Sequence, residues 1–325
     1  MMIRNRLAFL FLFTFALTAR ASLVRYWSGN PVDVEPALHG PVLDLAGSSA
    51  EETALQEMVD HVRGCRDECA VKLDVVVIRA SGSDGLNPVF MSLHGVNSVV
   101  TLLITDRPSA ERRDVAEIVN RAEIVWFAGG DQCNYIRWIK GTPVHRAVER
   151  VFRRGGGIGG NSAGLAIQGE IVYDACPDQS AASKDVMLNP FSVDVTLSTD
   201  FFRWPVMRGI ITDTHFHQRD RFGRLAVFLA RANANGKRVI GVAADEQTSV
   251  VVSPDGIGRV FGPGAAYVVV PARQAEVLAK GKPLTYRGLR VFAFRAGATF
   301  DLRKPPASGG RVIDVVDGKL SADPY

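Results

Sequence analysis

Runs of consecutive apolar residues alternate along the chain with segments in which apolar residues recur every three or four positions. The runs are rich in valine and isoleucine and are typical of buried parallel strands, whereas the spaced segments are typical of helices that cover them. The expected strands are 73–80, 98–105 and 123–128. The expected helices are 51–62, 110–122 and 142–153. This alternation predicts an α/β fold with a mainly parallel sheet.

The second half of the chain follows a different pattern. The stretch 181–190 interrupts the alternation and is expected to form a loop over a site, because long loops in compact domains are commonly functional. A strand at 208–212 and a helix at 222–235 follow, and strand patterns dominate the remainder. We therefore predict a single domain over 22–325 with extra C-terminal β-strands, which begins with a polar lead-in at 22–40.

The first 21 residues have the three parts of a secretory signal peptide. Arg4 and Arg6 supply a positive start, an apolar run covers 7–17, and the sequence ARA at 19–21 matches a cleavage site. The apolar run is short for a membrane span. We predict cleavage after this segment and a secreted or periplasmic protein; retention of the segment as a membrane anchor is the alternative.

Composition narrows the range of partners. The chain has 325 residues, of which 47% are hydrophobic, enough for a large core. The net charge is +4, and removal of the signal peptide takes away three arginines and leaves +1. Without a long basic run interleaved with aromatic residues, nucleic acid is not an expected partner. No later stretch is apolar enough to span a membrane, and the oligomeric state stays open, a homodimer included.

The stretch RRGGGIGGNSAGLAIQG at 153–169 contains the pattern G-x-S-x-G. A glycine-rich turn precedes the serine, and small apolar residues that can form a helix follow it. In this setting the serine occupies a nucleophile elbow, a tight strand-to-helix turn that a neighbouring Cβ atom would crowd. Ser162 is therefore the candidate nucleophile, and the N–H of Ala163 is a candidate oxyanion donor. The alternative is a glycine-rich turn with an incidental serine.

A serine hydroxyl needs a base to become a nucleophile. Of the six histidines, His215 and His217 follow an expected strand end, where ligands gather in α/β sheets. His215 is the preferred base, since it comes first after the strand and lies on the same face as Asp213. His217 is the second choice, and a structural core histidine is the alternative to both.

The acid that would hold the tautomer of this histidine is ambiguous in the sequence. The favoured region is 170–178, and its candidates are Glu170, Asp174 and Asp178. Other possible acids are Asp185, Asp213 and Glu246.

Three arginines follow the histidine at positions 219, 221 and 224, and guanidinium groups bind carboxylates through paired hydrogen bonds. One or two of them are expected to bind substrate, and one is expected to pair with Asp220 or Asp213. A solvated basic face is the alternative.

The strand expected at 123–128 ends in Gly129-Gly130-Asp131-Gln132. Two glycines at a strand end allow backbone to approach a ligand, and Asp131 and Gln132 open the next helix. A plain turn in which the aspartate caps the helix is the alternative interpretation.

Four cysteines are present. Cys65 and Cys69 flank a short charged turn and could form a disulfide in an exported protein. Cys133 and Cys176 are interpreted as small buried apolar residues. No second cysteine pair or histidine pair stands nearby, so neither a metal site nor a cofactor is predicted.

Three motifs together carry a resemblance to a known family. They are GGDQ (129–132), GGNSAGL (159–165) and DTHF followed by RDRFGRL (213–225). With these motifs the chain resembles the cyanophycinases, serine peptidases of the peptidase E group (S51). The resemblance extends from about residue 40 onward and includes RASGSDGLNP (79–88) and ADEQT (244–248). Asn161 and Thr214 depart from it, since threonine and glutamine are common at those places.

The resemblance implies a three-layer sandwich of the flavodoxin-like or class I glutamine amidotransferase-like type. It implies Ser162 as nucleophile and His215 as base, with an oxyanion hole formed near Gly130 and Ala163. It also implies that Gln132, Arg219 and Arg221, beside Asp131, lie around the substrate.

The implied activity is hydrolysis of cyanophycin, a poly-aspartate with arginine on each β-carboxyl, to β-aspartyl-arginine dipeptides. An aspartyl dipeptidase-like enzyme acting on small peptides is the closest alternative. A non-catalytic amidotransferase-like binding module is the second. A lipase-like esterase is disfavoured because no HGGG-type oxyanion loop is present.

Overall fold

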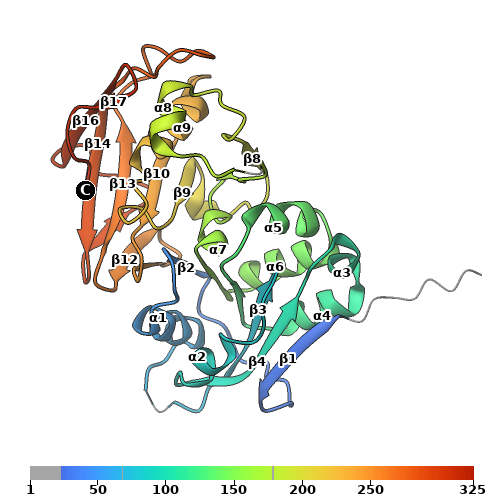
Figure 1. The fold of residues 1–325 in the computed structure, drawn as a ribbon. Helices are drawn as coiled ribbons and strands as arrows, with labels where there is room; N and C mark the ends of the chain where they lie inside the picture. Colours follow the sequence, from blue (N-terminus) through green and yellow to red (C-terminus); the bar gives the residue numbers. More distant parts are fainter. Residues whose placement is uncertain (1–22, 68, 178) are drawn as a thin grey trace, which may run out of the picture.

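A computed structural model describes residues 23–67, 69–177 and 179–325. Two β-sheets with helices around them form its frame (Figure 1). The α/β fold with additional C-terminal strands is confirmed, although both sheets mix parallel and antiparallel pairs. The predicted signal peptide, residues 1–21, lies outside the described residues.

The first sheet has nine strands and contains most of the strands from the first half of the chain. In spatial order they are β1 (Val24–Gly29), β4 (Val96–Leu103), β3 (Leu73–Arg79), β5 (Ile124–Phe127), β6 (Gly157–Asn161), β2 (Val42–Ala46), β11 (Ser249–Val252), β12 (Ile257–Phe261) and β15 (Thr299–Asp301). The five neighbours from β4 to β2 run parallel, and the strands outside them are antiparallel. The parallel part therefore brings five strand ends to one edge, where loops can form a site.

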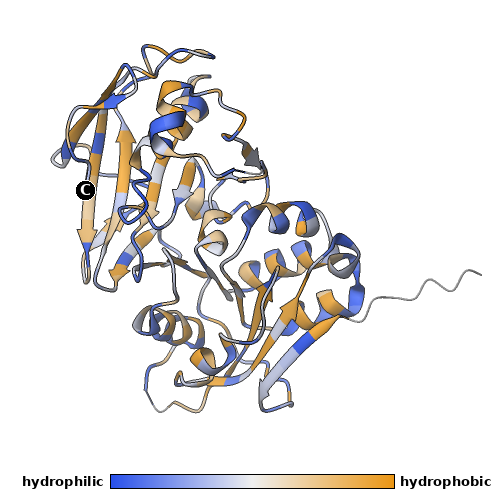
Figure 2. Cartoon of the chain, viewed as in Figure 1, coloured by the Kyte–Doolittle hydropathy of each residue, from blue (hydrophilic) through white to orange (hydrophobic). Residues whose placement is uncertain are grey.

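Helices cover both faces of this first sheet. Buried side chains of α1 (Glu52–Arg63) and α2 (Asn87–Met91) join one core cluster on one face. The other face packs on α3 (Arg107–Glu111), α4 (Arg113–Arg121), α5 (Gln132–Ile139) and α6 (Pro143–Arg153). Figure 2 shows that α1 and α6 carry both hydrophilic and hydrophobic residues, as expected for helices with one buried face. Because β3 leads to α2 and β5 leads to α5, these neighbouring strands are followed by helices on opposite faces.

The second sheet has eight strands, mostly from the second half of the chain. In spatial order they are β17 (Lys319–Leu320), β16 (Arg311–Val316), β14 (Tyr286–Arg295), β13 (Ala265–Pro271), β10 (Ile240–Ala244), β9 (Ile210–Asp213), β7 (Ile171–Tyr173) and β8 (Leu197–Thr199). Only β10, β9 and β7 are parallel neighbours. Helices α8 (Ser183–Leu188) and α9 (Phe222–Asn233) pack together beside this sheet (Figure 1).

The two sheets meet where the site lies. One core cluster contains buried side chains from both, such as Leu43 of β2 and Val242 of β10. At Gly47 the approach is so close that a Cβ atom would lie 1.9 Å from the carbonyl oxygen of Asp245. A glycine is required at that position, and the ends of β2 and β10 are held side by side.

Three local predictions were wrong. The helix expected at 110–122 is two helices, since Arg112 is extended with φ −68° and ψ 130°. The lead-in at 22–40 contains β1, an edge strand whose pairing with β4 compensates for its polar sequence. The loop expected at 181–190 contains α8, because Val186 and Met187 are buried in the core beside α9.

Candidate active site

Ser162 stands between β6 and the short helix α7 (Ala163–Ala166) with φ +52° and ψ −112°. Its neighbours in the motif explain how this turn fits. A Cβ atom on Gly160 would lie 2.6 Å from the carbonyl carbon of Gly164. A Cβ atom on Gly164 would lie 1.9 Å from the carbonyl oxygen of Phe127. Both glycines are therefore required by close packing, as the nucleophile-elbow interpretation predicts.

His215 contacts the serine. The Nε2 atom of His215 lies 2.8 Å from the Oγ atom of Ser162. His215 comes just after β9, has a positive φ of 46°, and its N–H donates to the carbonyl oxygen of Gly47 at 3.2 Å. Its side chain is 8% exposed. The loop from the second sheet thus brings a buried imidazole to a serine of the first sheet.

Glu246 completes a chain of three side chains. Its Oε1 atom lies 2.7 Å from Nδ1 of His215, on the ring edge opposite the serine. Glu246 follows β10, which pairs in parallel with β9, so the two strand ends deliver acid and histidine together. The N–H of Glu246 donates to Oε1 of Gln218 at 2.9 Å, which fixes the loop. This arrangement allows a serine, a base and an orienting carboxylate to act in series.

Glu170 and Asp174, the two described acids of the favoured region 170–178, do not occupy this place. The carboxylate of Glu170 accepts the N–H of Gly209. The carboxylate of Asp174 accepts the hydroxyls of Thr196 and Ser198. Asp178 lies outside the described residues. The acid beside His215 is Glu246, which the sequence analysis named only among the other possible acids. The available signal in the sequence was its place directly after an expected strand, which the structure shows as β10 beside β9.

Burial and charge set the protonation of this group. Burial lowers the pKa of His215 below its usual value near 6.5, and the hydrogen bond to Glu246 opposes that shift. The same hydrogen bond lowers the pKa of Glu246. At neutral pH the imidazole is therefore free of the extra proton and can accept one from Ser162, while Glu246 is ionised.

The other candidate residues that follow His215 have different neighbours. The ring of His217 stacks on Tyr325 with centroids 4.5 Å apart. Arg219 is 54% exposed, with its Nε 3.8 Å from Oε1 of Glu246. Arg221 donates to the backbone oxygen and the hydroxyl of Thr214, both at 2.8 Å. His217 is thus placed away from the serine, whereas Arg219 lies beside the triad.

Arg224 is the arginine that pairs with an acid. Its guanidinium donates to both carboxylate oxygens of Asp213, and the two side chains are 4% and 2% exposed. The guanidinium also lies over the ring of Tyr173, 5.1 Å from its centroid. Asp213 and Arg224 therefore form a buried support under the histidine loop.

The GGDQ segment lies against the elbow. A Cβ atom on Gly129 would lie 3.4 Å from Cβ of Ser162, so the following Gly130 is within the same neighbourhood. The carboxylate of Asp131 accepts the N–H of Cys133 at 2.9 Å and caps α5. Gln132 donates to the carbonyl oxygen of Tyr173 at 3.3 Å. The capping alternative thus describes Asp131, and Gly129 is the residue of the segment that packs beside the serine.

Both cysteine pairs form disulfides. Cys65 is bonded to Cys69, as the sequence allowed. Cys133 is bonded to Cys176, so the prediction of two buried thiols was wrong. Their separation of 43 residues hid the pairing, which depends on α5 and the segment after β7 meeting in space.

Asn161 is a residue of the site that sequence reasoning did not assign. Its Oδ1 accepts the indole N–H of Trp126 at 3.1 Å and the N–H of Gly129 at 3.2 Å. Its Nδ2 donates to the carbonyl oxygen of Ser48 at 2.5 Å. One side chain thus ties three segments around the elbow. Its position next to the nucleophile was the available signal.

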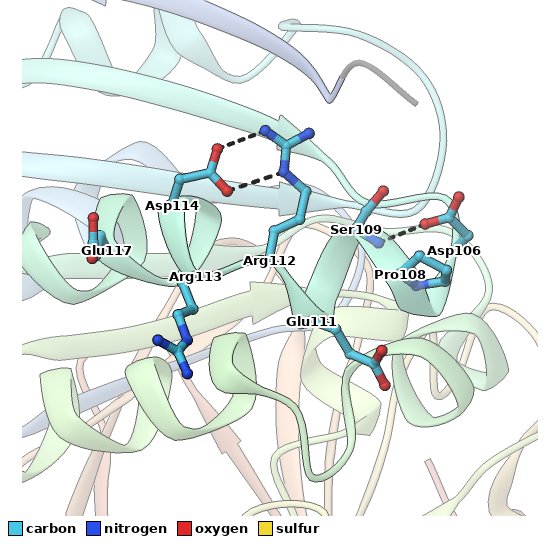
Figure 3. Close-up of a pocket in the computed structure, with 8 residues that line it drawn as sticks. All are labelled: Asp106, Pro108, Ser109, Glu111, Arg112, Arg113, Asp114 and Glu117. Atoms are coloured by element: carbon cyan, nitrogen blue, oxygen red, sulfur yellow. Dashed lines mark hydrogen bonds and ion pairs between the residues drawn. The ribbon is translucent and has the colours of Figure 1, made fainter. Parts of the chain in front are cut away.

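A large cleft lies elsewhere. It measures about 800 Å³, is lined by α3 and α4, and contains none of the triad residues (Figure 3). Two of its side chains, Arg112 and Asp114, form an ion pair with each other. Within the described ranges, no group of three His, Cys, Asp or Glu side chains is arranged to hold a metal ion. None of the helices described in the structure is both long and apolar enough to cross a membrane.

Comparison with known proteins agrees with the motifs. No protein-family model matches the chain. The chain is 27% identical over 214 residues to a cyanophycinase of Synechococcus elongatus, an alignment that covers 64% of this chain and 62% of that protein. It is 27% identical over 224 residues to a cyanophycinase of Geminocystis herdmanii, covering 67% of this chain and 76% of that one. The chain thus spans less than two thirds of the length of the Synechococcus protein it matches.

The fold also has a solved counterpart. The crystal structure of a peptidase from an acI-B1 Actinobacterium aligns with a TM-score of 0.53 and 16% identity, over 82% of this chain and 98% of that one. At this identity the likeness concerns the fold alone. Taken with the sequence matches, the resemblance to cyanophycinases that the three motifs predicted is confirmed.

Proposed function

We propose that this chain is an exported serine peptidase that hydrolyses cyanophycin to β-aspartyl-arginine dipeptides through an acyl-enzyme on Ser162. The single observation that carries the proposal is the connected series Ser162–His215–Glu246, with contacts of 2.8 and 2.7 Å. Such a series on a strained turn is the arrangement that activates a hydroxyl.

The reaction has two halves. The Oγ atom of Ser162 attacks the scissile carbonyl while Nε2 of His215 takes its proton, and Glu246 stabilises the resulting imidazolium through Nδ1. The imidazolium then protonates the leaving amine. Water, deprotonated by the same histidine, attacks the acyl-enzyme and releases the product. The N–H groups of Gly130 and Ala163 are proposed to hold the oxyanion in both halves.

The substrate assignment rests on chemistry around the triad. Cyanophycin presents both guanidinium and carboxylate groups, and the site carries charges of both signs. Arg219 is exposed beside Glu246, and Arg221 lies two residues further along the chain, with its Nη1 atom 3.7 Å from Oδ1 of Asp213. Burial lowers the pKa of Arg221 to about 10, so it remains charged at neutral pH and suits a substrate carboxylate. The cyanophycinases named above support the same substrate.

Export is proposed from two features. The predicted signal peptide would direct the chain out of the cytoplasm. The two disulfides, Cys65–Cys69 and Cys133–Cys176, are of the kind that persists in oxidising compartments. A polymer outside the cell must be cut before uptake, which suits an exported hydrolase. N-terminal sequencing of the protein recovered from its producing cells is expected to begin at Ser22.

An aspartyl dipeptidase-like enzyme is the closest rival, since it would use the same triad on smaller substrates. A substrate comparison separates the two. The purified protein is incubated with insoluble cyanophycin and, separately, with α-aspartyl dipeptides, and products are identified by mass. Release of β-aspartyl-arginine from the polymer is expected. Cleavage of dipeptides with no release from the polymer would favour the rival.

A covalent test distinguishes the proposed enzyme from a binding module without catalysis. A serine-directed phosphonate is expected to label the parent protein at Ser162 and to leave Ser162→Ala unlabelled. The variant should also release no dipeptide. Absence of both labelling and release in the parent, with the fold intact by circular dichroism, would reject the enzyme proposal.

A further inference from the structure

A second cleft adjoins the residues that flank the elbow. Its volume is about 350 Å³, and it is lined by Ser49, Arg79, Leu86, Gly129 and Asn161 among others. Gly129 and Asn161 form the wall it shares with the nucleophile, since Asn161 precedes Ser162 and a Cβ on Gly129 would lie 3.4 Å from the serine Cβ. A substrate group bound in this cleft would therefore contact the residue that precedes the nucleophile.

The cleft occupies the place where the fold is built to take a ligand. Arg79 ends β3, and Gly129 follows β5. These parallel neighbours are followed by helices on opposite faces, so the sheet has its topological switch point between them. Open α/β sheets bind ligands in the crevice at the carboxyl ends of such strands. The triad does not use this crevice, although residues of the segments RASGSDGLNP, GGDQ and GGNSAGL line it.

The charge in the cleft comes from Arg79. Its Nε donates to the carbonyl oxygen of Ser81 at 3.0 Å, which holds the guanidinium along the loop after β3. Across residues 23–67, 69–177 and 179–325, no carboxylate lies within 4.0 Å of this guanidinium. Two other arginines near the triad do have a carboxylate partner: Arg224 pairs with Asp213, and Arg219 lies 3.8 Å from Glu246. An oriented guanidinium in a cleft without such a partner is a site for an anion.

We propose that Arg79 forms a specificity subsite that binds a free carboxylate of the substrate next to the scissile bond. This inference rests on the proposed peptidase function and adds a substrate requirement to it: a peptide whose carboxylates are blocked would lose an interaction that Arg79 supplies. Arg79 is then a substrate-binding residue in addition to Arg219 and Arg221.

Equilibrium binding to Ser162→Ala protein tests the subsite without depending on turnover. The probes are a fragment of two β-aspartyl-arginine units and the same fragment with its free carboxylates converted to carboxamides. When Arg79→Met is added to Ser162→Ala, the affinity for the carboxylate probe is expected to fall by about 10- to 100-fold, as loss of a charge-assisted hydrogen bond would cause. The same substitution should change the affinity for the carboxamide probe by no more than about twofold.

The control is Arg153→Met, which removes an exposed arginine at the end of α6 and should alter neither affinity. Equal weakening of both probes by Arg79→Met, or no weakening of either, would overturn the subsite. Binding of neither probe by the Ser162→Ala parent would overturn it as well. In that case phosphonate labelling of the unmodified protein still reports on Ser162, so failure of the subsite is distinguishable from failure of the peptidase proposal.

Discussion

The two sides of the site are held by different kinds of contact. On the serine side, backbone packs on backbone, and Gly160 and Gly164 leave no space for a Cβ atom. On the histidine side, side chains hold one another: Glu246 orients His215, and Arg224 neutralises Asp213 beneath it. The serine side can be recognised from a sequence window of five residues, whereas the histidine side involves residues of two loops whose meeting the sequence does not reveal.

The largest expected effect tests the side-chain contacts. Glu246→Gln keeps the shape but removes the charge that stabilises the imidazolium, so kcat is expected to fall by about 10³- to 10⁴-fold. Steady-state hydrolysis measures this change. Asp185→Asn is the matched control, because this exposed acid of α8 is another carboxylate that the sequence left open, and it should leave kcat within about twofold. Equal losses in both variants would contradict the role of Glu246.

The backbone contacts predict an effect on stability. Gly164→Ala places a methyl group 1.9 Å from the carbonyl oxygen of Phe127, which forces the elbow to move. We expect the free energy of unfolding to fall by about 3 kcal/mol or more, at the upper end for overpacking. Urea denaturation measures it. Gly141→Ala, at a glycine with open space around it but a φ of +74°, is the comparison that separates packing from backbone strain alone.

A smaller effect concerns Asp44, which lies in β2 opposite Gly159 of the nucleophile strand. Asp44 is fully buried, and neither of its carboxylate oxygens has a hydrogen-bond partner in the described part of the chain. Burial raises its pKa to about 8, so the folded state holds a proton that the unfolded state loses near pH 4. Stability therefore falls as pH rises from about 4 to about 8 and then levels off.

Asp44→Asn removes that slope because the amide does not ionise. Relative to the parent, the variant should gain about 2 kcal/mol or more between pH 5 and pH 8, measured by urea denaturation across that range. A difference that stays constant with pH would mean that Asp44 is ionised in the folded protein or has a partner.

The smallest effect is a shift in the pH profile. Only unprotonated His215 can accept the proton of Ser162, so kcat/KM should fall as pH drops through the pKa of this histidine. Burial lowers that pKa, so the midpoint is expected below 6.5. In Glu246→Gln the opposing hydrogen bond to a carboxylate is lost, and the midpoint should move further down. A midpoint above 6.5 in the parent would contradict this.

These two sides also explain how far the sequence could be interpreted. His215 follows a strand that the apolar pattern predicts, and Ser162 is marked by its glycine-rich motif, whose preceding residues form the strand β6 where a turn was expected. The structure brings the serine and the histidine together. Glu246 could not be chosen from the sequence because it reaches His215 only when β10 lies beside β9, and this pairing is formed by the tertiary structure. The lead-in strand β1 was missed for the same reason, since its pairing with β4 is not visible in its own polar sequence.

The disulfide between Cys133 and Cys176 restrains the segment of chain that contains the elbow. The bond closes a covalent ring of the chain, and Ser162 lies inside that ring with β6 and α7. A cross-link over a separation of 43 residues reduces the conformational freedom of the unfolded chain by about 4 kcal/mol in the chain-entropy model. The ring makes the nucleophile dependent on the redox state of its surroundings: the protein would keep a tethered elbow outside the cell and lose that tether in a reducing cytoplasm.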